Sequence, residues 1–170
     1  MPGKAIGISF NFGYPGTISR LGDEISRTRP FKSGTDAIYF GDPVIINTDG
    51  TTQKFGAANT AAQFAGVAMR KIKGATQYLN QNRAFYTDQD PVDILERGGV
   101  TVNVNVGTPT IGGAVYIRIA ANGSIPAGVV GGFEAADDGA NTIQITNAKW
   151  ATLKDANGVA ELTILTRQGV

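Results

Sequence analysis

The chain has 170 residues, enough for one compact domain that buries a sizeable core without disulfides or metal ions. It contains no Cys and no His, which excludes thiolate chemistry, Cys-based zinc sites and the most common general base and metal ligand. Only 17% of the residues are charged and the formal net charge is +1, which argues against nucleic acid as a direct partner.

The composition indicates a β-rich protein rather than a helical or disordered one. Gly occurs 23 times, and Thr, Val, Ile and Asn are abundant, which is typical of short strands joined by tight turns. No run approaches the roughly 18 apolar residues of a membrane span, and no hydrophobic leader follows Met1. We therefore expect no membrane partner, and synthesis in the cytosol.

Residues 1–35 are predicted to form an extended N-terminal arm, because Gly and Pro recur too often for a long helix or a central strand. Apolar residues occupy even positions, as in a strand with one apolar side: Ile6, Ile8, Phe10, Phe12, Tyr14 and Ile18. Basic residues outnumber acidic ones in this segment, and three of them are Arg20, Arg27 and Arg29. Such an arm either lies on a partner or packs as an edge strand on its own body. The sequence favours the two alternatives about equally.

Residues 36–170 are predicted to form a single β-rich body. Turn sequences such as Gly41-Asp42-Pro43 and Asn122-Gly123 separate the strand candidates, because these residue types suit tight turns. Residues 56–62 form either one short helix or a loop. The predicted strands are residues 37–40, 44–47, 64–70, 92–95, 100–106, 114–119, 129–134, 142–146 and 159–165.

The strand at residues 100–106 has the clearest pattern in the sequence. Val occupies every second position, at Val100, Val102, Val104 and Val106. Successive side chains of a strand point to opposite faces, so a slip by one residue would expose all four Val side chains to water. We therefore predict that this strand is central and half or fully buried.

No catalytic, cofactor-binding or metal-binding residues can be assigned from the sequence. A nucleophile needs an adjacent base, and no Ser lies in a Gly-flanked elbow or has a His to activate it. The glycines lack the strand–loop–helix context of a phosphate-binding fingerprint. Four acidic residues lie close in the sequence without a recognisable ligand spacing: Asp88, Asp90, Asp93 and Glu96. They are interpreted as a turn and a strand end, with a weakly bound cation as the alternative. Binding or assembly remains as the function.

Several short motifs occur in a distinctive order along the chain. The chain has Gly-Asp-Pro-Val at 41–44, Phe-Ala-Gly-Val-Ala at 64–68, and a long Asp-x-Val-x-Ile-Leu-x-x-Gly-Gly-Val-x-Val run at 90–102 that extends to Val104. Gly-x-Ala-Val-Tyr-Ile-Arg follows at 112–118, and a closing pair of segments lies at 145–150 and 158–164. In this order the motifs resemble those of the structural cement and head-decoration proteins of tailed phages.

The resemblance implies a non-enzymatic virion protein with a β-barrel or β-sandwich body. Such a protein would be made in the host cytoplasm, bind the phage major capsid protein on the capsid exterior and stabilise the expanded head. It would form a homo-oligomer, expected to be a trimer on the lattice, and its arm would bind the capsid or a neighbouring copy. The alternative is an adhesion or carbohydrate-binding β module of a phage or bacterial surface structure. Such modules usually expose aromatic residues, whereas we predict that Trp150 and Tyr116 are core.

Overall fold

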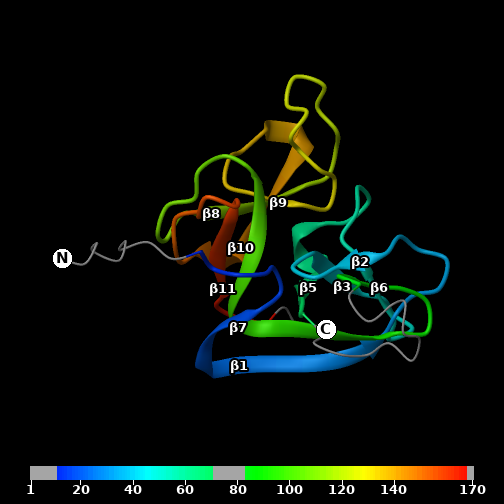
Figure 1. Ribbon diagram of the computed structural model, residues 1–170. Coiled ribbons are helices and arrows are strands. Elements are labelled where there is room, and N and C mark those ends of the chain that lie inside the picture. The colour runs from blue at the N-terminus through cyan, green and yellow to red at the C-terminus, as the bar shows by residue number, and fades with distance from the viewer. Residues whose placement is uncertain (1–10, 71–82, 168–170) are drawn as a thin grey trace.

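The computed structural model describes residues 11–70 and 83–167, which form an all-β structure (Figure 1). Eleven strands make one large sheet and one two-stranded sheet. The helical residues within these ranges belong to two three-residue 3-10 helices, η1 (Ala61–Gln63) and η3 (Gly139–Asn141). The predicted all-β fold with at most one or two short helices is therefore confirmed.

The strands agree with most of the predicted ones and differ mainly in their lengths. In chain order they are β1 (Ile18–Pro30), β2 (Ile38–Tyr39), β3 (Pro43–Ile46), β4 (Thr52–Lys54), β5 (Phe64–Ala68), β6 (Phe85–Tyr86), β7 (Pro91–Val106), β8 (Ala114–Arg118), β9 (Phe133–Glu134), β10 (Thr142–Trp150) and β11 (Val159–Ile164). The prediction did not include β4 and β6, and it gave an edge strand in the region of β1 only as one of two alternatives for the arm. It also made β9 too long, because residues 129–132 have β-forming composition but form turns.

The long strand β7 belongs to both parts of the large sheet. Its C-terminal part closes a barrel in the order β7, β11, β10, β8, β9 and back to β7. β11 pairs antiparallel with residues 98–103 of β7, and β9 pairs parallel to it around Val104. β1 and β5 pair with the N-terminal part of β7, and the sheet continues from β5 through β3 to β4. The body is thus a closed barrel with a sheet extending from it.

Gly98 and Gly99 lie inside β7, where the prediction placed a break between two strands. Gly98 has φ +114°, a conformation that side-chain-bearing residues rarely adopt, and a Cβ atom there would lie 3.1 Å from the Asp23 carbonyl oxygen. A Cβ atom on Gly99 would lie 2.6 Å from Ser19 Oγ. The two glycines therefore let β1 pass close to β7 while the strand continues, so the prediction of two separate strands was wrong.

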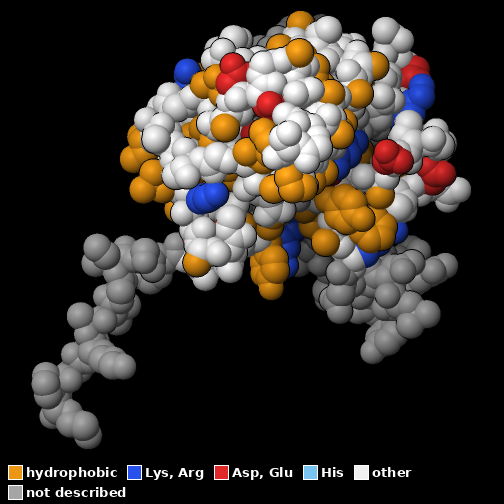
Figure 2. Space-filling view, turned by 90° about the horizontal axis from the view of Figure 1, so that it is seen from above, with side chains coloured by type: hydrophobic (Ala, Val, Ile, Leu, Met, Phe, Trp, Pro, Cys, Tyr) orange, Lys and Arg blue, Asp and Glu red, His pale blue; other side chains and the backbone are white. Residues whose placement is uncertain are grey.

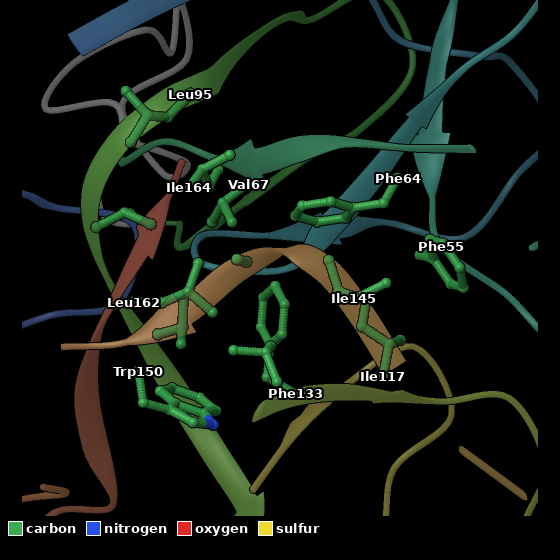
Figure 3. Packing of buried hydrophobic residues seen from close by; sticks show 14 of the residues in the cluster. Phe55, Phe64, Val67, Leu95, Ile117, Phe133, Ile145, Trp150, Leu162 and Ile164 are labelled. Carbon is green, nitrogen blue, oxygen red and sulfur yellow. The ribbon is translucent and has the colours of Figure 1, made fainter. Parts of the chain in front are cut away.

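The barrel interior holds the main hydrophobic core (Figure 3). Val100, Val102 and Val104 of β7 are 0%, 0% and 6% exposed and Val106 is half-buried, so the predicted burial of this strand is confirmed. Trp150 is also core, as predicted, whereas Tyr116 is only half-buried. A second cluster packs the β2–β6 sheet against the large sheet with these buried residues: Phe31, Ile38, Val44, Ala68, Tyr86, Val92 and Ile94.

Candidate functional site

The predicted arm residues fall into two groups. The first three lie outside the described residues: Ile6, Ile8 and Phe10. Phe12 is half-buried, and its backbone N–H donates to Asp155 Oδ2 at 2.9 Å. Tyr14 is 66% exposed, and the Arg70 guanidinium lies 4.3 Å from the centre of its ring. The chain therefore enters the body at Phe12 and presents an aromatic side chain to solvent directly afterwards.

The three arginines predicted for the arm lie on β1, which pairs with β7 of the same chain. Arg20 forms an ion pair with the buried Glu161 at 3.2 Å, and its own side chain is 75% exposed. Arg27 forms an ion pair with Glu96 at 3.4 Å, and Arg29 is half-buried. Residues 18–30 thus pack on the chain's own body, which is one of the two alternatives that the sequence left open.

Phe12 enters beside two loops at one end of the barrel. These are residues 107–113, between β7 and β8, and residues 151–158, between β10 and β11. Lys154 Nζ donates to the Gly107 carbonyl oxygen at 2.8 Å, so the loops are held together. We call this surface, made of Phe12 and both loops, the arm end of the barrel. It carries two strongly exposed apolar residues, Ile111 at 78% and Leu153 at 57%.

Asp155 fixes the entry of the chain at the arm end. Its carboxylate accepts hydrogen bonds from the backbone N–H groups of Phe12, Asn157 and Val159 at 2.9–3.0 Å. Burial acts to raise the pKa of Asp155, but these three donors outweigh burial and lower the pKa below its ordinary value. The group therefore stays ionised near neutral pH, where it holds the root of the arm against the β10–β11 turn.

A buried ionic cluster lies on the other side of the barrel, at the ends of β8 and β9. Arg118 and Glu134 are completely buried, and Arg118 Nη2 donates to Glu134 Oε2 at 2.9 Å. Arg118 Nη1 also donates to Asp138 Oδ2 at 2.8 Å. Hydrogen bonds, first from Asn122 and then from Arg118, lower the pKa of Asp138.

This cluster also holds the connection between β8 and β9 in place. The Gly128 backbone lies directly on the guanidinium, because a Cβ atom there would be 2.2 Å from Arg118 Nε. A guanidinium between two carboxylates in a closed space has no room for a substrate. We therefore interpret the Arg118 cluster as a structural element that fixes the loop.

The acidic residues near β7 are separated and have different partners. Asp90 accepts from the Thr87 backbone N–H at 2.8 Å, consistent with the predicted turn, and Asp93 accepts from Thr28 Oγ1 at 2.6 Å. Glu96 is buried and forms ion pairs rather than aligned hydrogen bonds. Within residues 11–70 and 83–167, no group of three acidic, His or Cys side chains could hold a metal ion. No helix in that part of the chain is long and apolar enough to cross a membrane.

A groove of about 730 Å³ opens on the side of the molecule where β2 and β4 lie. It is lined by residues 34–37, Tyr39, residues 53–56 and Val130, and we call it the β2–β4 groove. Tyr39 is 53% exposed, which makes it an exposed aromatic residue that the sequence analysis missed. Its position at the end of a short strand before the Gly41 turn gave no distinguishing signal. Lys54 Nζ lies over the Tyr39 ring, 5.9 Å from its centre, and forms an ion pair with Asp42 at 2.9 Å.

Comparison with known proteins shows which family shares this architecture. Residues 3–164 match the family model described as XM1 gp53 minor capsid protein. The chain belongs to this family. Among solved structures, a chain of "The capsid of Myoviridae Phage XM1" has the same fold, with a TM-score of 0.70 and 15% sequence identity over 98% of each chain. No curated protein sequence matches the chain.

Membership of the XM1 gp53 minor capsid protein family gives the chain a structural role in the phage virion, associated with the capsid. The resemblance to capsid-associated phage proteins is thereby confirmed. The capsid-binding role of the arm residues stays a prediction, as does the division into residues 1–35 and 36–170.

Proposed function

We propose that this minor capsid protein binds the outer surface of the major capsid lattice and stabilises the expanded head, without catalysing a reaction. The family match over residues 3–164 carries the proposal. A protein that binds only the expanded lattice adds its binding free energy to the stability of that lattice by linkage. Many copies with modest interfaces are enough for this effect. The protein would be made in the host cytoplasm and act on the virion exterior.

The proposed contact surfaces are the arm, which binds the lattice or a neighbouring copy, and the arm end of the barrel, which binds the lattice. The apolar alternation of the arm would continue from Ile6 to Tyr14, and Tyr14 is exposed at its described end. Ile111 and Leu153 expose apolar area beside it, and removing such area from water stabilises a complex by about 25 cal/mol per Å². Figure 2 shows one face of the body, on which patches of hydrophobic side chains lie between charged ones.

Deleting residues 2–10 is expected to abolish decoration of expanded heads while leaving the thermal melting curve unchanged. The deletion keeps Phe12 with its bond to Asp155, and it keeps the whole of β1. Electron microscopy of heads mixed with the truncated protein, together with circular dichroism melting, measures both effects. A longer deletion through residue 30 would remove β1 from β7 and is expected to unfold the protein.

A variant of unchanged length tests whether the apolar side chains, rather than the length of the arm, are needed for decoration. The triple variant Ile6→Ser, Ile8→Ser, Phe10→Ser is expected to behave like the deletion, and Ser9→Ala is expected to decorate normally. Normal decoration by the triple variant would contradict the proposal. A much lower melting temperature for the deletion would instead mean that the segment is part of the core.

The protein is further proposed to form a closed ring on the lattice, a trimer. In a closed ring one pair of surfaces serves every copy and no binding surface is left open. Shared burial also helps a chain that has no Cys for disulfides. A reconstruction of decorated heads is expected to show density in threes around three-fold points. Isolated copies, or dimers across two-fold points, would contradict the trimer.

A further inference from the structure

The β2–β4 groove contains a short open stretch of strand edge, at Lys54 of β4. On one side β4 pairs with β3, where Phe55 N–H donates to the Pro43 carbonyl oxygen. On its outer side the Thr52 carbonyl oxygen accepts from the Lys32 N–H at 2.8 Å. Backbone groups of a strand alternate between its two edges, so Lys54, two residues after Thr52, also points its N–H and C=O outward. Lys54 faces Val44 of β3 at a position next to the bonded Phe55–Pro43 position, and it makes no backbone hydrogen bond outside the sheet among the described residues.

The walls of the groove suit an extended peptide with one apolar side. Tyr39 and Val130 supply apolar surface from two separate segments, whereas the Phe55 side chain is buried in the barrel core and only its backbone lines the groove. Gly34 and Gly56 have no side chains, so another backbone can approach closely. The backbone beside Val130 lies close against the end of β4, because a Cβ atom added to Gly131 would collide with the Phe55 carbonyl oxygen. An open edge flanked by apolar surface is the arrangement that proteins use for strand addition.

The N-terminal segment has the complementary pattern. Ile6, Ile8 and Phe10 would lie on one face of a strand, and small or polar residues lie between them. Lys4 is the only charged side chain among residues 1–10. The groove offers it the exposed Asp36, which has no hydrogen-bond or ion-pair partner in the described part of the chain. Pattern and charge therefore match.

The arm root and the groove lie on different sides of the body. The chain enters beside the β10–β11 turn at Asp155, near the labels β8 and β11 in Figure 1, whereas β2 lies at the opposite side of that view. Residues 1–10, if fully extended, would span at most about 35 Å. A donor surface and an acceptor surface on different sides of one molecule allow a head-to-tail contact between copies, and such contacts form a ring when the rotation between copies closes.

We propose that residues 4–10 of one copy add as a strand to the outer edge of β4, in the β2–β4 groove of the next copy. The inference rests on the proposed function, because it identifies the neighbour that the arm binds when the ring forms on the capsid. Ile6, Ile8 and Phe10 then cover Tyr39 and the adjoining groove wall. The backbone groups of Lys54 gain partners, and Lys4 reaches Asp36. The barrel-end residues Ile111 and Leu153 stay available for the capsid lattice.

Disulfide trapping tests the inference cleanly because the chain contains no Cys. Two single variants, Ile8→Cys and Gln53→Cys, are mixed on expanded heads, with a size tag on one of them, and oxidised. Gln53 lines the groove, and Asn103→Cys on an exposed position of β7 replaces it as the control. A disulfide-linked tagged pair is expected with Gln53→Cys and not with Asn103→Cys. Decoration of the same heads is scored by electron microscopy.

Each outcome separates the inference from the proposed function. Decorated heads without the linked pair would overturn the inference and leave capsid binding intact, with the arm on the lattice. Equal disulfide formation with Asn103→Cys would also overturn it, because the disulfides would then come from random collisions. The double variant Ile8→Cys, Gln53→Cys is expected to form disulfide-linked oligomers of several chains. If it closes within single chains, the arm fills its own groove and the inference is wrong. Failure of the unmodified protein to decorate heads would overturn the proposed function itself.

Discussion

Val102→Asp is expected to unfold the protein at ambient temperature. Val102 is completely buried in β7, pairs with Ala160 of β11 and belongs to the barrel core with Trp150 and Phe133. The new carboxylate would have no partner there, and burying an unpaired charge costs several kcal/mol. The free energy of unfolding of a domain is only about 5–15 kcal/mol. Urea denaturation followed by circular dichroism measures the loss.

Asn103→Asp provides the matched control, because Asn103 is the next residue of the same strand and is exposed. It introduces the same carboxylate, and its free energy of unfolding is expected to stay within about 0.5 kcal/mol of the unmodified protein. If Val102→Asp denatured at the same urea concentration as Asn103→Asp, β7 would not be the central strand of a closed barrel. The fold would then need to be reconsidered.

Sequence patterns predicted the strands whose buried faces alternate, and they missed those that are held in other ways. β7 was found through its valines. β1 was given only as an alternative, because Leu21 and Ile25 are its only apolar residues between Ile18 and Pro30 and they show no two-residue period. Backbone pairing and ion pairs such as Arg20–Glu161 hold it in place. Such contacts leave no period in the sequence. β4 and β6 are too short, at three and two residues, to show a period at all.

The candidate surfaces were predicted only where they are local in sequence. The arm is one segment with a visible alternation, so its apolar positions could be read directly. The β2–β4 groove combines segments around residues 34–39 and 53–56 with Val130, and only the fold brings them together. Arg118 and Glu134 likewise appeared as the end of a motif and an ordinary strand residue. Their pairing depends on β8 lying beside β9.

Arg118→Met is expected to lower the free energy of unfolding by about 3–5 kcal/mol. The substitution leaves Glu134 completely buried without its guanidinium partner, and it also removes a hydrogen bond to Asp138. Arg97→Met is the matched control, because Arg97 pairs with Asp23 at the surface, where an ion pair contributes about 0–1 kcal/mol. Both variants replace one strand arginine by Met, so the difference between their free energies of unfolding measures the effect of burying the ion pair.

The double variant Arg118→Met, Glu134→Leu separates the unpaired charge from lost packing. Replacing both members of a buried pair by apolar residues is often neutral or stabilising, so most of the stability lost in Arg118→Met is expected to return. The two substitutions should therefore be strongly non-additive in a double-mutant cycle of urea denaturation. Asp138 still loses its bond from Arg118 but keeps the one from Asn122 at 3.0 Å, so recovery is expected to be incomplete. Additive losses would instead mean that Arg118 stabilises the β8–β9 connection through its packing against Gly128, with the charge of Glu134 contributing little.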